Sequence, residues 1–235
     1  IVDTHVDPEV VAPKIIPGRT YANGVLSTCE QNFICHESMF DALVKALEKN
    51  GAYYVADQKL VDDLRETLYP AGALNKKAVG LSAVTIAKMA GFEVPEGTKA
   101  LIAKANGAGT ADVYGKEKLF PIIAAYTYKT WEEGVGIALA NLEMEGAGHS
   151  STVHSNNKEH VEYAGLTLPV SRLLVNGVGS SGVGGAYSNS FVPTATLGCG
   201  SWGNNSISEN LNYVHLMNVS RIGYTDESKP APTPE

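Results

Sequence analysis

A cysteine next to a tight turn is the first feature of this sequence that could carry covalent chemistry. The stretch NGVLSTCEQ, residues 23–31, places Cys29 after an Asn-Gly turn and before the apolar run NFIC. A thiol in such a place suits a nucleophile, because its thiolate form attacks carbonyl carbon. A thiol beside an apolar run equally suits a side chain that only fills the core. The stretch by itself leaves both interpretations open.

Cys29, Cys35 and His36 could also be read as ligands of a metal ion. Their spacing matches no zinc pattern, and the sequence offers no evident fourth ligand. The chain has three cysteines, an odd number without framework spacing. We therefore expect reduced thiols, no disulfide scaffold and no metal site.

His149 and Glu117 are further candidates because of their neighbours. Glycines precede His149 and strand-like residues follow it, so its imidazole could reach a pocket. His154 comes five positions later, and an odd offset along a strand puts two side chains on opposite faces. These two histidines should therefore share no ligand. Glu117 lies between a loop and the apolar stretch PIIAAY, where a solvated carboxylate is the simplest interpretation.

The composition excludes several classes of protein. The chain has 235 residues, 44% hydrophobic and 18% charged, which is typical of a globular protein with a substantial core. A net charge of −7 without a Lys/Arg cluster argues against a nucleic-acid partner. No window approaches the roughly 18 apolar residues that a membrane span needs. We expect a cytoplasmic protein that acts on small molecules and has no membrane partner.

The elements that must position these residues alternate between strands and helices. Helices are expected from Ser38 to before Gly51, over 57–68, 82–90 and 158–164, and from a capping box at Thr130 to about Glu143. Strands are expected over 31–36, 52–56, 99–105, 121–128, 150–155 and 171–176. This order predicts an α/β fold around a largely parallel sheet flanked by helices. Active sites of such sheets lie at strand carboxyl ends, which makes the loops that follow strands worth inspecting.

Two local expectations concern the ends of the chain. Pro13 and Pro17 make a continuous helix before Asn23 doubtful. A second capping box, Ser206 to Glu209, predicts a short final helix.

A glycine-rich motif imitates a dinucleotide fingerprint. GVGSSG, residues 177–182, has the form G-x-G-x-x-G and follows the strand-like RLLVN. The fingerprint also needs a helix that opens at the third glycine and an acidic residue about 20 positions further on. Neither is present in the sequence. We therefore interpret the stretch as a flexible surface loop.

Five longer stretches together resemble one family. They are GRTYANGVLSTCEQ, GKEKLFP, NLEMEGAGHSSTVHS, SRLLVN and PTATLGCGSWGNNSISEN. These stretches resemble the CoA-acylating aldehyde dehydrogenases, above all the CoA-dependent succinate semialdehyde dehydrogenases and the aldehyde half of the bifunctional aldehyde–alcohol dehydrogenases. The resemblance runs from about residue 1 to residue 224.

The resemblance implies an activity and several site residues. Members of the family interconvert an aldehyde and its acyl-CoA with NAD or NADP, through a thioester on a cysteine. Carried over residue by residue, Glu117 contacts the ribose on the nicotinamide side, with Leu119 near the ring. His149 lies near the nucleophile and assists proton transfer around CoA, and Leu197 lines the nicotinamide pocket.

The sequence departs from the family at the nucleophile. The family reads N-G-hydrophobic-hydrophobic-Cys-small-Ser-Glu-Gln, whereas this chain has Ser27 at the cysteine position and Cys29 at the serine position. Three explanations remain open: an engineered Cys-to-Ser substitution, a naturally inactive or repurposed domain, or attack by Cys29 itself. The last requires a displacement of about 6–7 Å along an extended chain.

The resemblance also sets the expected domains and partners. Residues 1–224 correspond to the catalytic half, without the Rossmann-type nucleotide-binding half, and 225–235 are expected to be a flexible Pro-rich tail. Succinate semialdehyde is the favoured aldehyde, with acetaldehyde or another short aldehyde as alternatives. A homo-oligomer is expected. The rival hypothesis is a catalytically inactive domain that acts in assembly or scaffolding.

Overall fold

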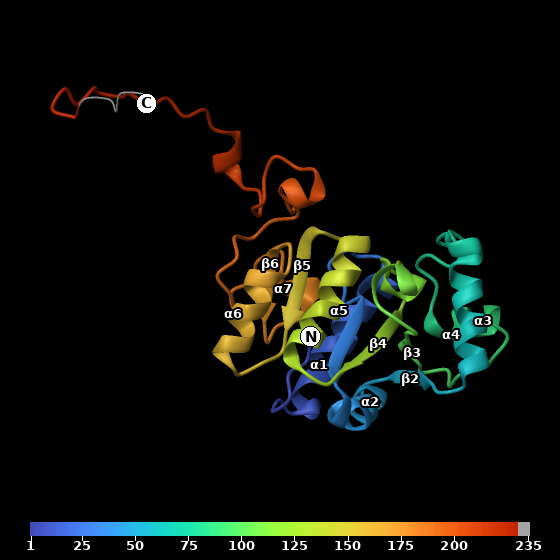
Figure 1. The fold of residues 1–235 in the computed structure, drawn as a ribbon. Helices are drawn as coiled ribbons and strands as arrows, with labels where there is room; N and C mark the ends of the chain where they lie inside the picture. The colour runs from blue at the N-terminus through green and yellow to red at the C-terminus, as the bar shows by residue number, and fades with distance from the viewer. Residues whose placement is uncertain (230–235) are drawn as a thin grey trace.

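The computed structural model describes residues 1–229 and has an α/β architecture (Figure 1). Its strands are β1 Asn32–His36, β2 Ala52–Val55, β3 Ala100–Lys104, β4 Ile122–Tyr128, β5 Gly148–Val153 and β6 Val170–Val175. Its α-helices are α1 Pro8–Thr20, α2 Phe40–Lys49, α3 Gln58–Leu68, α4 Ala83–Met89, α5 Trp131–Met144, α6 Lys158–Thr167 and α7 Gly179–Gly182. The expected α/β fold with parallel strands flanked by helices is confirmed.

The strands form two parallel sheets that the start of the chain joins. One sheet has the order β1-β4-β3-β2 and the other pairs β5 with β6. Val2 lies between them, because it makes isolated parallel bridges to Cys35 on one side and His154 on the other. Figure 1 shows the first residue in this position, between the β5-β6 pair and β1. This arrangement brings β1 and β5, and the residues at their ends, close together.

Two hydrophobic clusters cover the two faces of the larger sheet. Alternate strand residues point to opposite faces, so Phe33 and Cys35 join a cluster with α1 and α2, whereas Ile34 joins a cluster with α3, α4 and α5. Strands buried on both faces explain why their sequences are continuous apolar runs.

Helix α1 is continuous through both of its prolines, which corrects the expected interruption. Each proline lacks the N–H for the usual backbone bond, but one face of the helix is buried in the core through Val11, Ile15 and Ile16. The Asp7 side chain accepts a hydrogen bond from the Glu9 N–H and caps the first turn. Packing and capping therefore outweigh the tendency of proline to interrupt a helix.

The expected helix at residues 206–209 is wrong. The chain instead forms a bridge between Leu197 and Asn210 and a short 3-10 helix, Tyr213–Leu216, capped by Asn212. Residues 217–229 contain no helix or strand, and they extend away from the layered body (Figure 1). Part of the expected Pro-rich tail, residues 230–235, lies outside the described residues.

Candidate active site

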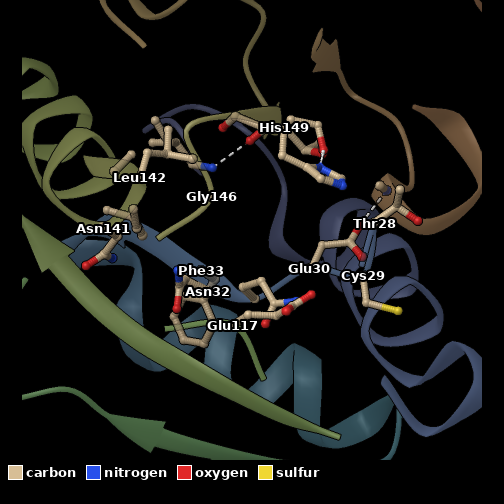
Figure 2. A pocket seen from close by; sticks show the side chains of 18 of the residues that line it. Thr28, Cys29, Glu30, Asn32, Phe33, Glu117, Asn141, Leu142, Gly146 and His149 are labelled. Carbon is tan, nitrogen blue, oxygen red and sulfur yellow. Dashed lines mark hydrogen bonds between the residues drawn. The ribbon is translucent and has the colours of Figure 1, made fainter. Parts of the chain in front are cut away.

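A cavity of about 300 Å³ lies where segments from distant parts of the chain meet (Figure 2). Its walls come from residues 27–34, the loop containing Glu117, the end of α5 and the start of β5. Three of these segments precede strands: 27–31 precedes β1, Glu117 precedes β4, and Gly146 precedes β5. The cavity therefore does not lie at the loops after the strands, which the general rule for parallel sheets had made worth inspecting. The loops that lead into the strands converge here, at the amino edge of the sheet.

Ser27 is an exposed residue on the wall of this cavity. The chain reaches it from α1 through a tight turn in which Ala22 and Asn23 have positive φ of 47° and 53° and Gly24 has φ 79°. Beyond Ser27, the N–H of Cys29 bonds to the Leu26 carbonyl at 2.9 Å before β1 begins. The side chain of residue 27 therefore lies on an exposed loop that borders the cavity.

Cys29 borders the cavity but its sulfur is withdrawn from it. The residue is 3% exposed, and its Sγ lies 3.6 Å from the Tyr21 carbonyl oxygen. Figure 2 shows the sulfur pointing away from Glu117 and His149. Burial raises the pKa of the thiol, although the Arg19 cation partly opposes this effect. A buried thiol with a raised pKa is a poor nucleophile.

We expect thiol labelling to reflect this burial. Cys35 is fully buried and burial raises its pKa to about 12, whereas Cys199 is half-buried. Iodoacetamide should therefore modify Cys199 at least about tenfold faster than Cys29 or Cys35. Peptide mass spectrometry at timed intervals measures the three rates, and labelling in urea, where all three should react, is the control. Fast modification of Cys29 in the folded chain would show that its thiol is accessible and would reopen its role as nucleophile.

Glu117 faces the same cavity from the loop before β4. Its N–H donates to Glu145 Oε2 at 2.8 Å and its carbonyl oxygen accepts from the Tyr69 hydroxyl at 3.0 Å, so its backbone is held on both sides. The side chain is half-buried, and burial together with the nearby Glu145 carboxylate raises its pKa. The carboxylate is thus not a freely solvated loop group.

His149 is the second residue of β5 and also borders the cavity. Its Nδ1 lies 2.7 Å from Ser150 Oγ, which leaves Nε2 to exchange a proton. Burial lowers the pKa of this imidazole, and the Arg172 cation lowers it further, so the ring is neutral at pH 7. A neutral imidazole can accept a proton.

Arg172 fixes the backbone around His149. The guanidinium is 3% exposed and donates to the carbonyl oxygens of His149 at 2.9 Å and Gly198 at 2.7 Å, and to Asn210 Oδ1 at 3.2 Å. A side chain at Gly148 would collide with the Cys199 carbonyl. The stretch LGCG therefore packs against the start of β5. Through these hydrogen bonds, Arg172 holds the backbone of His149 and Gly198 and the side chain of Asn210 together.

The glycine-rich stretch 177–182 holds the loop of residue 27. After β6 it forms only the four-residue helix α7, and Gly179, Gly182 and Val183 are buried, which corrects the expectation of a flexible surface loop. The Gly179 N–H donates to Glu30 Oε1 at 2.5 Å, and Thr28 Oγ1 donates to the Ser180 carbonyl at 3.1 Å. The motif contacts the protein's own backbone and side chains where a fingerprint would contact a pyrophosphate.

Glu30 is a half-buried residue with a buried carboxyl oxygen, Oε2, and the sequence did not single it out. It lies against Gly18 of α1, where any side chain would overlap it, and its Oε2 has no hydrogen-bond partner. Burial raises its pKa to about 7, against the lowering effects of the Gly179 amide and the Arg19 cation. The only signal in the sequence was a glutamate directly after Cys29.

The structure thus brings together three of the five residues carried over from the family. Ser27, Glu117 and His149 border one cavity, although they are separated by up to 122 positions in the chain (149 − 27). Leu119 and Leu197 are half-buried and are not among its lining residues; the Leu119 carbonyl instead accepts the Gly80 N–H at 2.9 Å. Their contact with a cofactor remains a prediction.

Metal-ligand clusters and membrane-spanning helices were the remaining features to locate in residues 1–229. In this range no three His, Cys, Asp or Glu side chains are grouped so as to hold a metal ion. His154 also borders the cavity, but burial lowers its pKa to about 3, and no ligand set includes it. No helix of the described range combines the length and the apolar character that crossing a bilayer demands.

The chain is similar over its whole length to acetylating dehydrogenases, although no family model matches it. It is 48% identical over 235 residues to a succinate-semialdehyde dehydrogenase (acetylating) of Clostridium kluyveri, and the match covers 100% of this chain and 52% of that protein. It is 34% identical over 232 residues to the bifunctional aldehyde-alcohol dehydrogenase of Escherichia coli K12, covering 97% of this chain and 26% of that protein.

The fold agrees with these similarities. The crystal structure of an acetylating aldehyde dehydrogenase from Geobacillus thermoglucosidasius matches with a TM-score of 0.88 and 31% identity, covering 98% of this chain and 51% of the other. The chain therefore spans about half the length, or less, of the proteins it matches.

Proposed function

Because the chain belongs to the family of CoA-acylating aldehyde dehydrogenases, we propose that the whole protein, when it carries a cysteine at residue 27, oxidises an aldehyde to its acyl-CoA with NAD or NADP and catalyses the reverse reduction. One observation carries this proposal. Residue 27, Glu117 and His149, which the family motifs assign to the nucleophile, the cofactor contact and proton transfer, border the same cavity.

Residue 27 is proposed as the position of the nucleophile. A thiol there would attack the aldehyde carbonyl and carry the acyl group as a thioester, which suits a thiolate because it both attacks and leaves readily. A serine hydroxyl would need a strong adjacent base, and its ester is less reactive. We therefore expect the chain with Ser27 to have little or no dehydrogenase activity.

His149 is proposed to accept the proton of the CoA thiol. Its lowered pKa keeps the imidazole neutral at pH 7, and the Ser150 hydroxyl orients the ring through Nδ1. A proton can then be taken up at Nε2 when the thiol attacks the thioester.

Glu117 is proposed to bind the ribose on the nicotinamide side of the cofactor. Its backbone is held by Glu145 and Tyr69, so its carboxylate approaches the cavity from a fixed position. When bound, NAD or NADP supplies the hydride acceptor and CoA supplies the thiol that receives the acyl group. Leu119 and Leu197 would have to contact the nicotinamide from outside the present cavity.

The identity of the aldehyde is a finer proposal. Succinate semialdehyde is favoured by the similarity to the Clostridium kluyveri enzyme. Among the described lining residues there is no Lys or Arg, and Glu30, Glu117 and Glu145 are all present. A substrate carboxylate would therefore need a cation from another part of the protein, and a short uncharged aldehyde is the alternative.

We further propose a cytoplasmic homo-oligomer. The support for self-association is a row of exposed apolar side chains in the extended C-terminal segment: Tyr213, Leu216, Met217, Val219, Ile222 and Tyr224. Apolar surface of this extent on one segment is typical of a contact with another polypeptide.

The proposed function is tested by product formation in a complete enzyme. The chain with Ser27→Cys would be joined to the upstream half of the Clostridium kluyveri relative and supplied with succinate semialdehyde, acetaldehyde or propanal. We expect reduced cofactor to form over many turnovers only when CoA is present, with the matching acyl-CoA identified by mass spectrometry. A folded chimera that forms no acyl-CoA from any of these aldehydes would refute the proposal.

A further inference from the structure

Arg19 is a completely buried cation whose hydrogen bonds all go to backbone carbonyls. Its side chain is 0% exposed. Nη1 donates to the Glu30 carbonyl at 3.0 Å, and Nη2 donates to the carbonyls of Gly24 at 2.9 Å, Phe120 at 2.7 Å and Lys118. Burying a guanidinium is costly unless its donors are satisfied; here Nη1 and Nη2 are bonded, whereas the buried Nε has no partner among the described residues. An arginine confined to carbonyls in this way fixes backbone segments relative to one another.

The four carbonyls belong to the two loops that form the proposed site. Gly24 and Glu30 lie three residues before and three residues after Ser27, so the guanidinium spans the base of that loop. Lys118 and Phe120 follow Glu117 closely in the chain. We propose that Arg19 is a positioning residue that holds residue 27 in register with Glu117 and contributes positive charge to a thiolate at residue 27. This inference rests on the proposed function for the roles of those two residues.

The backbone around Arg19 is shaped to admit the guanidinium. Gly24 has φ 79°, and a Cβ there would collide with Nη2 and lie 2.8 Å from the Phe120 carbonyl oxygen. A second set of bonds links the same loops: the Lys118 N–H donates to Gln31 Oε1 at 2.7 Å, and Lys118 Nζ donates to Asn32 Oδ1 at 3.1 Å. Two independent groups of contacts therefore join the segments that follow residue 27 and Glu117.

Several titratable groups lie near the positive charge of Arg19. The titratable groups that face it are Glu30, Cys29, Tyr69, Glu117 and Lys118. Burial lowers the pKa of Arg19 to about 10, so it remains a cation at pH 7. No described contact pairs it with a carboxylate oxygen, and its charge therefore remains available to stabilise a nearby anion.

The test measures the pKa of a thiol introduced at residue 27 and the order of its loop, and it does not depend on catalytic turnover. In the chain carrying Ser27→Cys, the pH dependence of iodoacetamide alkylation at residue 27, located by tandem mass spectrometry, gives the pKa of the introduced thiol. Amide hydrogen exchange over residues 24–30 reports the order of the loop. Arg19→Met should raise the pKa of the introduced thiol by about one unit and speed exchange by on the order of tenfold. Arg19→Lys should leave that pKa within about 0.3 and still speed exchange.

Arg65→Met is the matched control. Arg65 is a less buried arginine than Arg19; it pairs with Asp62 and, through bonds of 3.0 and 2.9 Å, with Asp112, and no described hydrogen bond joins it to either loop. Its loss should destabilise the fold without shifting the pKa of the thiol introduced at residue 27. If Arg19→Met matches Arg65→Met in both readouts, the inference is overturned. If Arg19→Met does not fold, unchanged exchange over 24–30 in Arg19→Lys overturns it instead. No readout needs dehydrogenase activity, so failure of the proposed function would be seen separately, in the chimera.

Discussion

Ser27→Cys should raise the rate of CoA-dependent aldehyde oxidation by at least about 10³-fold in the complete enzyme, because loss of a covalent nucleophile typically costs this much or more. The substitution is small, residue 27 is exposed on the cavity wall, and the loop is held on both sides by Arg19 and by the Gly179–Glu30 contact. The new sulfur should therefore occupy the cavity without repacking the core. Initial rates of cofactor reduction at saturating CoA measure the gain.

Two variants separate the new thiol from other causes of a gain. Ser27→Ala removes the hydroxyl without adding a nucleophile and should show no increase. Cys29→Ser, combined with Ser27→Cys, should preserve most of the gain, because the Cys29 sulfur is buried against the Tyr21 carbonyl. If activity in the double variant falls below that of the Ser27 chain, which still contains Cys29, then Cys29 is the reacting thiol and our assignment of residue 27 is wrong.

Glu30→Gln should change how the stability of the fold depends on pH. The folded pKa of Glu30 is raised from 4.5 to about 7, mainly by burial. The folded state thus binds the proton more tightly than the unfolded state, and this stabilisation is complete below about pH 4.5 and is lost as the pH rises through about 7. Between about pH 5 and about pH 8 the loss is about 2.5 kcal/mol. Glutamine cannot ionise, so the variant should lack this loss.

Urea unfolding of the parent and the variant at both pH values measures the difference. Other titrating groups, including the buried His154, contribute to both proteins and cancel in the comparison. Glu66→Gln, at an exposed position on α3, is the matched control and should follow the parent. The contrary result is a free energy of unfolding of Glu30→Gln that falls with pH as steeply as that of the parent. That result would mean that Glu30 is already ionised at about pH 5 in the folded parent, and hence well solvated.

The elements of the fold were largely predictable because their signals are local. Apolar residues at helical spacing placed α2 and α3, and Thr130 marked the start of α5, where its hydroxyl accepts the Glu133 N–H at 3.3 Å. The capping box at Ser206 did not start a helix, because apolar residues that follow it, such as Val214 and Leu216, remain exposed, and a cap alone stabilises a helix by only about 1 kcal/mol. The two prolines of α1 did not interrupt the helix, because the burial of one helix face outweighed the loss of two backbone hydrogen bonds.

The sequence by itself determined the family resemblance, the α/β class and the serine at residue 27, because residue identity and short-range periodicity carry that information. Only the tertiary structure decided that residue 27, Glu117 and His149 border one cavity, that this cavity lies at the amino edge of the sheet, and that Arg19 joins its loops. The bond from Arg19 to the Phe120 carbonyl spans 101 positions of the chain. Backbone carbonyls are the same in every residue, so which of them meet a given side chain depends on how the strands and helices pack and is not written in any local pattern.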